Sequence, residues 1–378
     1  MHPNTPGGSA LKIPIIWVHR GQSLHCPPLK KWKSSEIKMY GTTIVFKWKM
    51  ILRKIVIKPL ASESLGVRSM CTFVETPDVR LLLDAGVSLC PYRFGLPPHP
   101  REFKAIAQCR KDITVAADKS EVVTISHYHF DHHTPSYEDW MCNWTVADET
   151  AKQIYQEKHV LLKNYREDIN SSQRRRGWLF RKTGGKHARK LETADTRTFD
   201  YNKTKIRFSK PVFHGAENTF LGWVLMTTIE LESEKFMFAP DVQGPMSNEA
   251  TSLILHERPD VLLIGGPPLY LLGSKVNVRE TNFALANLAK IIRKVKCVIL
   301  EHHILRDESW REKTGSVFEN AEKTGSSVIT SAEFLGKENM FLESSRKRLY
   351  EEEPPSAEFE DWRRRSARLT RPPKPPIE

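Results

Sequence analysis

The sequence predicts an α/β fold in which two β-sheets pack against each other and helices cover their outer faces. The first half of the chain contains mainly strand-like runs, whereas helical and strand-like runs alternate from residue 248 onward. An apolar fraction of 39% over 378 residues is enough for a sizeable core, and single α/β domains often exceed about 250 residues. We therefore expect one large folded domain over residues 50–343.

The chain opens with β-rich sequence, followed by a helix. A Thr76-Pro77-Asp78 turn separates two strand-like runs and predicts a hairpin. Apolar residues at helical spacing come next, and a short apolar run then ends at Ser126. We predict a helix at 100–117 and strands at 51–60, 69–75, 79–84 and 121–125.

The middle of the chain contains a strongly basic segment. Asp148 can cap a helix that continues through Tyr165. The glycine-punctuated basic residues 174–190 are typical of an inserted loop or hairpin, so we predict a basic helical insertion near 148–195. These basic residues either contact phosphate groups or only carry solvated charge. Strand-like runs then resume at 204–208, 222–231 and 235–238.

The last part of the domain has the alternation of helix and strand that is typical of parallel sheets. Each apolar run of strand length is followed by a longer amphipathic run. We predict helices at 249–257, 278–295 and 307–323, and strands at 261–264 and 297–300.

Both ends of the chain differ from the middle in composition. Residues 1–49 are basic, with Glu36 as their single acid, and are either a disordered leader, a transit peptide or sequence ahead of a start at Met39 or Met50. The charged, proline-rich residues 344–378 should be a disordered tail, because they bury too little surface to fold alone. No apolar run approaches the roughly 18 residues that span a bilayer, so no membrane segment is expected.

Charge and cysteine content limit the partners and the compartment. A formal charge of +13 favours anionic partners such as nucleic acid or phosphorylated metabolites. The six cysteines form no Cys-x-x-Cys pair, which argues against a zinc ribbon or a disulfide framework and indicates reduced thiols in a cytoplasmic protein. The composition does not predict an oligomeric state.

A histidine cluster follows the strand predicted at 121–125. His127 and His129 project to the same side of an extended segment, so both imidazoles can reach one metal ion. Asp131 and His132 come as the loop turns and can bind a second ion. Two ions about 3.5 to 4 Å apart that share a water need more ligands than this loop supplies.

Further ligand-type residues follow other apolar runs. His214, Asp241 and the pair His302 and His303 each come directly after a strand-like segment. A buried sheet would hold such residues rigidly. The sequence therefore predicts that these residues meet the histidine cluster at one edge of the fold.

The order of these residues resembles the metallo-β-lactamase superfamily, whose signature is His-x-His-x-Asp-His followed by a lone His, a bridging Asp and a final His. The match runs from about Ile51 to Leu342 and implies a four-layer αββα sandwich that forms a catalytic domain. Several phrases resemble an uncharacterised prokaryotic metallo-hydrolase branch without an assigned substrate. They are residues 64–69, 126–133, 241–245, 265–268 and 302–307.

The resemblance implies a role for each candidate. His127, His129 and His214 resemble the ligands of a first ion, and Asp131, His132 and either His302 or His303 those of a second. Asp241 resembles the carboxylate that bridges both ions. The implied ions are two divalent metals, most typically Zn²⁺, with Mn²⁺ or Fe²⁺ as alternatives. The implied catalytic residues are Asp131 and Asp241, which orient the water, and His302, which donates a proton to the leaving group.

Four more residues are candidates around the metals. Asp84 resembles the aspartate that orients the metal loop by hydrogen bonding, although it could be an ordinary turn residue. His133 is expected beside the ligands or in the pocket rather than as a ligand. Gly265 and Gly266 either line the substrate pocket, where the lack of a Cβ permits close approach, or only form a turn.

The expected function is hydrolysis of an ester-type bond by a metal-dependent enzyme. A phosphodiester is favoured because the chain is positively charged, and thioesters and lactones are the alternatives. Two other classes stay open. One is a nucleic-acid-binding protein with a structural metal site. The other is a diiron reductase, although that branch usually has Glu where this chain has His129.

Overall fold

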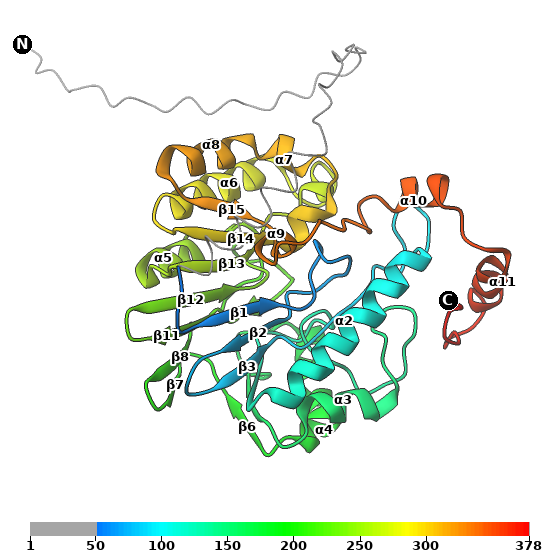
Figure 1. Cartoon of the computed structure of the whole chain (residues 1–378), viewed down its shortest axis with the longest axis horizontal. Helices are drawn as coiled ribbons and strands as arrows, with labels where there is room; N and C mark the ends of the chain where they lie inside the picture. The colour runs from blue at the N-terminus through cyan, green and yellow to red at the C-terminus, as the bar shows by residue number, and fades with distance from the viewer. Residues whose placement is uncertain (1–50, 378) are drawn as a thin grey trace, which may run out of the picture. The chain divides into compact units, whose positions relative to one another are not determined.

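The computed structural model describes residues 51–377, in which two β-sheets pack face to face (Figure 1). Strands β1 to β6 form the first sheet in chain order, antiparallel from β1 to β3 and parallel from β3 to β6. Its strands are β1 Val56–Pro59, β2 Thr72–Glu75, β3 Arg80–Leu83, β4 Val122–Ile125, β5 His159–Leu162 and β6 Lys190–Thr193.

The second sheet has the order β15-β14-β13-β12-β11-β8-β7, in which β12 to β15 are parallel. Its strands are β7 Thr198–Tyr201, β8 Thr204–Phe208, β11 Thr227–Leu231, β12 Glu234–Ala239, β13 Val261–Gly265, β14 Cys297–Glu301 and β15 Ser327–Ile329. A short ribbon of β9 Val212–Phe213 and β10 Trp223–Val224 stands apart from both sheets.

Alternating side chains divide the interior into three apolar layers. In β3, Leu81 and Leu83 belong to the layer between the sheets, whereas Leu82 packs toward the helices. In β13, Leu263 faces the other sheet and Leu262 the helices. Because successive side chains of a strand point to opposite faces, both sheets are buried on two sides. The predicted four-layer αββα sandwich is confirmed.

Helices cover the outer face of each sheet. The first sheet carries α2 Pro100–Lys119, α3 Ala147–Tyr155 and α4 Ser171–Lys182, and the second carries α5 Asn248–Glu257, α6 Val278–Ile292 and α8 Gly315–Thr324. Shorter helices are α7 Trp310–Lys313 and α9 Ser331–Phe334, and 3₁₀ turns are η1 Gly184–His187, η2 Leu269–Leu271 and η3 His302–Arg306. No helix in residues 51–377 is long and apolar enough to cross a membrane.

The basic middle segment differs from the prediction. The helix expected to reach Tyr165 ends at Tyr155, and β5 follows. Residues 174–190, expected to be a loop or hairpin, contain most of α4 and lead into β6. Because β5 and β6 pair in parallel within the first sheet, this segment is part of the sandwich rather than an inserted element.

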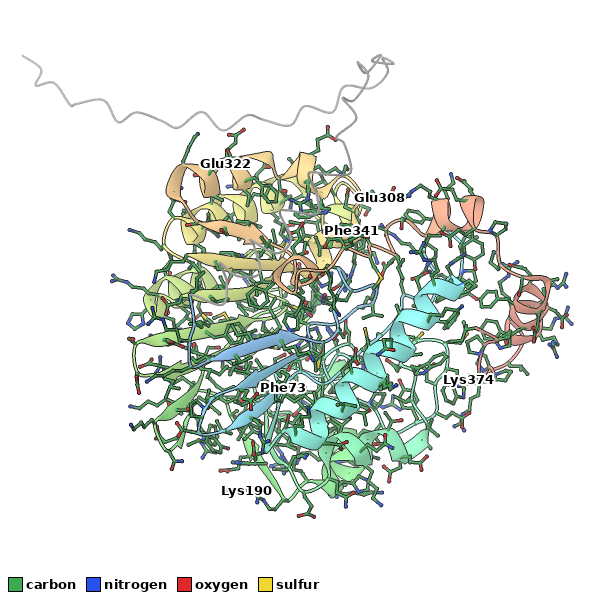
Figure 2. The ribbon with its side chains drawn as sticks, in the orientation of Figure 1. Phe73, Lys190, Glu308, Glu322, Phe341 and Lys374 are labelled. Carbon is green, nitrogen blue, oxygen red and sulfur yellow. The ribbon has the colours of Figure 1, made fainter. Side chains whose placement is uncertain are left out.

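The C-terminal residues do not form the disordered tail that we expected. They contain α10 Arg346–Glu352 and α11 Ala357–Ser366. Arg346 is fully buried, with Nη2 2.7 Å from Glu102 Oε1 of α2, and Phe359 packs on Phe103 of the same helix. Lys374 lies near the end of the chain (labelled in Figure 2), and its ammonium is 5.4 Å from the centroid of the Trp140 ring. The predicted leader, residues 1–49, lies outside the described residues.

Candidate metal centre

The centre lies where parallel strands of both sheets end. β4 leads directly into Ser126 and the histidine loop, β12 leads into Asp241, and β14 leads into His302. Asp84, Asp241 and His302 have φ values of 47°, 50° and 67°. Left-handed backbone at non-glycine residues costs about 1–3 kcal/mol and persists where the surroundings impose it. The chain thus bends sharply at three strand ends and directs these side chains to one point.

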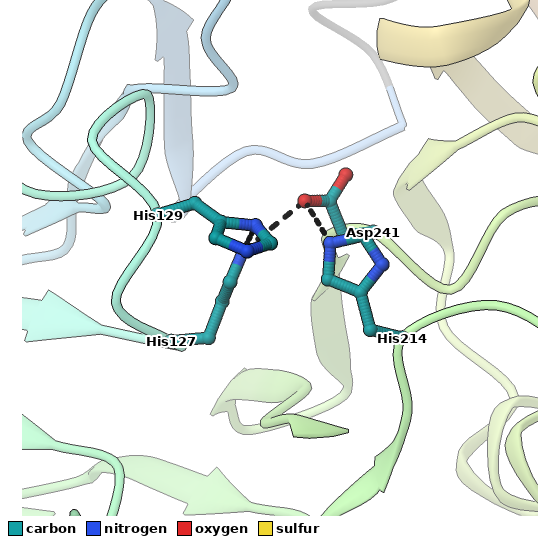
Figure 3. A group of neighbouring side chains, drawn as sticks. All are labelled: His127, His129, His214 and Asp241. Atoms are coloured by element: carbon teal, nitrogen blue, oxygen red, sulfur yellow. Dashed lines mark hydrogen bonds and ion pairs between the residues drawn. The ribbon is translucent and has the colours of Figure 1, made fainter. Parts of the chain in front are cut away.

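The Asp241 carboxylate is at the middle of the cluster. Its Oδ2 lies 3.1 Å from His127 Nε2, 3.2 Å from His132 Nε2 and 2.9 Å from His214 Nε2. Its Oδ1 lies 2.8 Å from His302 Nε2. Figure 3 shows the rings of His127, His129 and His214 gathered beside this carboxylate.

The donor atoms fall into four groups that share members, with donor atoms within 4.8 Å of one another in each group. Two of the groups contain the predicted ligands: one is His127, His129, His214 and Asp241, and the other is Asp131, His132 and His302. The remaining groups are Asp84, His127 and His132, and Asp241, His302 and His303. His127 Nε2 and His129 Nδ1 are 3.0 Å apart. Ligands about 2.0–2.1 Å from a tetrahedral zinc ion lie about 3.3 Å from each other. Both groups therefore have a spacing that suits a metal ion.

Several atoms of the centre are buried without hydrogen-bond partners. In the described residues these include His132 Nε2, Asp241 Oδ1 and His303 Nε2. Buried polar atoms are normally paired, because leaving one unpaired costs about 1–3 kcal/mol. Nitrogen and carboxylate donors without a thiolate suit Zn²⁺, Mn²⁺ or Fe²⁺. The residues present therefore fit divalent metal ions.

The buried carboxylates of the centre also require nearby positive charge. Burial alone would raise the pKa of Asp131, but His132 and His302 hold it far below its ordinary value. Burial lowers the pKa of His302, yet the carboxylates of Asp241 and Glu63 raise it to about 9. The carboxylates are thus anionic, and their charge has to be balanced by protons on imidazoles or by metal ions.

A second layer of hydrogen bonds orients the predicted ligands. Asp84 Oδ1 accepts from the Ser126 backbone N–H at 2.8 Å, and Asp84 Oδ2 lies 2.8 Å from His132 Nδ1. His133 Nδ1 lies 2.9 Å from the His129 carbonyl oxygen. Such contacts fix ring orientation and leave the other nitrogen free for a metal. Asp84 and His133 therefore have the placement expected for supporting residues.

The sequence did not predict two members of this layer. Glu63 Oε2 lies 3.0 Å from His302 Nδ1, and Arg306 Nη2 donates to Glu63 Oε1 at 2.6 Å. Glu63 is far from His302 along the chain, and nothing around it marks a metal site. Both residues lie in or beside phrases that carry the family resemblance, which was the one available signal.

Hydrogen-bond direction distinguishes His302 from His303. Arg306 Nη1 donates to His303 Nδ1 at 2.9 Å. A guanidinium has only donors, so this nitrogen must accept and the neutral ring carries its proton on Nε2. In contrast, Glu63 can only accept from His302 Nδ1, so the Nε2 of His302 becomes free for a metal only when the ring is neutral. The Nδ1 partners thus differ, whereas the Nε2 atoms of both rings lie beside Asp241 Oδ1, at 2.8 Å for His302 and 3.3 Å for His303.

A cavity of about 800 Å³ opens over the centre. Asp131, Asp241 and His303 border it, whereas the side chain of His302 is fully buried and does not. Gly265 and Gly266 do not line it either. A Cβ on Gly266 would lie 2.6 Å from Ile304 Cβ, and one on Gly265 would lie 3.0 Å from the Asp241 backbone nitrogen. These glycines permit close packing behind the centre, which corrects their predicted place in the pocket.

The chain is similar to curated relatives over nearly their whole length. A UPF0282 protein of Methanopyrus kandleri is 42% identical over 296 residues, which are 78% of this chain and 99% of the relative. A UPF0282 protein of Methanocaldococcus jannaschii is 42% identical over 294 residues, which are 77% and 95%. No family model matches the chain.

Solved structures align with the chain at 12% identity. Unliganded yeast PDE1 aligns over 73% of this chain and 97% of its own, with a TM-score of 0.44. The short form of human tRNase Z aligns over 65% and 92%, with a TM-score of 0.38. CmlA, a diiron β-hydroxylase from Streptomyces venezuelae, aligns over 73% and 52%, with a TM-score of 0.43.

Proposed function

Since this chain belongs to the UPF0282 family, a name that states no reaction, we propose its function from its metal centre: it is a metal-dependent hydrolase that activates water against an ester-type bond. The observation that carries the proposal is the meeting of seven ligand-type side chains, from both sheets, beneath an open cavity. They are His127, His129, Asp131, His132, His214, Asp241 and His302.

Within this proposal, the two groups of donors would hold two divalent ions, with zinc as the first candidate and manganese or iron as alternatives. Bound there, the ions would supply Lewis acidity for the ester and would lower the pKa of a water molecule. Asp131, which borders the cavity as an anion, is placed to orient that water. His303 borders the cavity with its Nε2 3.3 Å from Asp241 Oδ1, and this N–H would donate a hydrogen bond to negative charge that develops on the ester.

We favour a phosphodiester as the substrate because cationic side chains line the cavity. Apart from Asp131 and Asp241 of the centre, the cavity has no carboxylate among its lining residues, but it has three arginines and one lysine. Such a cavity attracts and orients an anion, whereas a neutral lactone gains little from it. Thioesters and lactones remain the alternative substrates of the same centre.

We place the protein in the cytoplasm. The five cysteines in the described part of the chain are free, and four of them are buried, which suits a reducing compartment. A nucleic acid is a possible partner of a chain with a net charge of +13.

A substrate panel tests the proposal. Full-length protein is treated with a chelator, reloaded with Zn²⁺ or Mn²⁺, and assayed with bis(4-nitrophenyl) phosphate, S-lactoylglutathione and a lactone. We expect metal-dependent hydrolysis, fastest with the phosphodiester, and its loss in Asp241→Ala but not in the exposed control Asp200→Ala. RNA binding that persists without metal, together with no hydrolysis of any panel member, would instead support a nucleic-acid-binding protein with a structural metal site.

A further inference from the structure

We infer that the substrate is a nucleotide-sized phosphodiester, with its phosphate held by Arg176 and Lys275 and its planar ring stacked on Phe220. All three residues line the cavity over the metal centre. The inference rests on the proposed hydrolase function. It adds that the phosphodiester to be cleaved is attached to a nucleoside.

Two of the four cations in the cavity are already neutralised. Arg68 pairs with Glu343 through Nε at 2.5 Å, and Arg306 pairs with Glu63 at 2.6 Å. Throughout residues 51–377, Arg176 and Lys275 have no such carboxylate partner, and the one side-chain hydrogen bond of Arg176 is a 3.5 Å contact with the Tyr128 carbonyl oxygen. Two unpaired cations that face the same cavity form an anion subsite.

Arg176 is held beside the metal ligands. Its guanidinium lies 4.7 Å from the centroid of the Phe130 ring, and Phe130 stands between the predicted ligands His129 and Asp131 in the chain. The next residue of α4, Gly177, permits this approach because a Cβ there would lie 2.7 Å from the Tyr128 ring. A phosphate bound by Arg176 would therefore be next to the centre.

Phe220 is an exposed aromatic residue on a segment with defined contacts. Its side chain is 98% exposed, which leaves the whole ring face available to a ligand. Asn170 Nδ2 donates to the Phe220 carbonyl oxygen at 2.9 Å, and Gln173 Nε2 donates to that of Leu221 at 2.7 Å. Both donors lie at the start of α4, the helix that carries Arg176. One helix thus sets the positions of both the proposed phosphate contact and the proposed stacking ring.

The volume of the cavity limits the size of the ligand that can bind. About 800 Å³ is within the range of pockets for small molecules and cofactors. Aromatic stacking accepts any nucleobase, because every base has a flat π face. A mononucleotide ester can bind the anion subsite, stack on the aromatic ring and fill the cavity. A simple alkyl phosphodiester can bind only the anion subsite.

Two esters with the same leaving group test the inference. Metal-loaded full-length protein is assayed with thymidine 5′-(4-nitrophenyl phosphate) and with methyl 4-nitrophenyl phosphate. We expect kcat/KM to be at least about tenfold higher for the thymidine ester, the size of a typical base–aromatic stack. Phe220→Ala should reduce this ratio to below about threefold, and Arg176→Met and Lys275→Met should raise KM for both esters.

Matched controls come from the same helix. Arg175→Met and Trp178→Ala change exposed residues of α4 that do not line the cavity, and they should leave the ratio unchanged. Metal content and melting temperature of each variant show that the fold and the centre are retained.

The outcomes separate the two proposals. Equal kcat/KM for both esters in the unaltered protein, or a ratio that survives Phe220→Ala, contradicts the inference and leaves the hydrolase proposal intact. Faster hydrolysis of an oligonucleotide than of the thymidine ester also contradicts it. No hydrolysis of either ester at full metal loading contradicts the hydrolase function itself.

Discussion

At the scale of single residues, the neighbouring histidines 302 and 303 have opposite hydrogen-bonding roles. The Nδ1 of His302 faces Glu63, whereas the Nδ1 of His303 accepts from Arg306, and both rings direct Nε2 toward Asp241. Because His302 and His303 are identical neighbours with different partners, matched substitutions can test which of them binds a metal ion.

We predict that His302→Ala loses metal and that His303→Ala does not. The first change removes a ligand, so metal content should fall from about two ions per chain toward one. The second removes a donor to developing charge, so kcat should fall by about 10²–10³ with the metal content unchanged. Elemental analysis and steady-state kinetics on both variants check this. The reverse pattern would identify His303 as the ligand.

The sequence predicted the ligand residues more completely than their supports. His127, His129, His132 and Asp241 follow strand-like runs at recognisable spacing, and the structure brings them together. Glu63 is separated from His302 by the whole domain, and only the folded chain places its carboxylate 3.0 Å from that ring. A hydrogen bond between distant segments leaves no local pattern in the sequence.

At the scale of elements, the turn after β3 supports the histidine loop. A Cβ on Gly86 would lie 2.4 Å from the backbone nitrogens of both His132 and His133. Backbone atoms at that distance cannot move without displacing the loop, so no larger residue fits there. The turn after β3 therefore packs directly against the histidine loop and fixes its position.

We predict that Gly86→Ala destabilises the fold by about 1–3 kcal/mol, the usual cost of overpacking, and lowers metal content. Gly315→Ala is the matched control. Nothing lies within 4 Å of the added carbon at Gly315, which begins α8, and alanine is the better helix former. Urea denaturation and elemental analysis measure both effects. Equal stability of the two variants would show that the loop moves freely.

The missed elements have identifiable causes. Residues 159–162 are a short apolar run, and because a strand buried on both faces has no alternation, it could not be distinguished from a continuing helix. The polar, glycine-containing sequence of α4 indicated a loop, but its asparagine cap and its packing on the Tyr128 ring stabilise a helix. Tertiary contacts outweighed local propensity in both cases.

At the scale of the whole molecule, the predicted sandwich is confirmed, and the C-terminal residues add to the first sheet's helical layer. Phe359 and Trp362 belong to the same apolar cluster as α2. Composition alone indicated disorder, since these residues are charged and proline-rich. The buried pair of Arg346 and Glu102 joins segments that are far apart in the chain.

We predict that Arg346→Met destabilises the protein by about 3–5 kcal/mol, because it leaves the Glu102 carboxyl buried without its cation. The control Arg348→Met changes an exposed arginine of the same helix and should cost less than about 0.5 kcal/mol. Denaturant titration of both variants measures the difference. Indistinguishable midpoints would mean that the tail contributes no stability to the domain.

The central claim is that distant ligands from both sheets bind metal ions at one edge of the sandwich. Its most direct test is elemental analysis of full-length protein purified without chelators, compared with Asp241→Ala. We predict about two transition-metal ions per chain in the unaltered protein and a marked loss in the variant, because the Asp241 carboxylate lies 2.8–3.2 Å from nitrogens of His127, His132, His214 and His302. Unaltered protein that contains no metal, and takes up none when Zn²⁺, Mn²⁺ or Fe²⁺ is supplied, would contradict the claim.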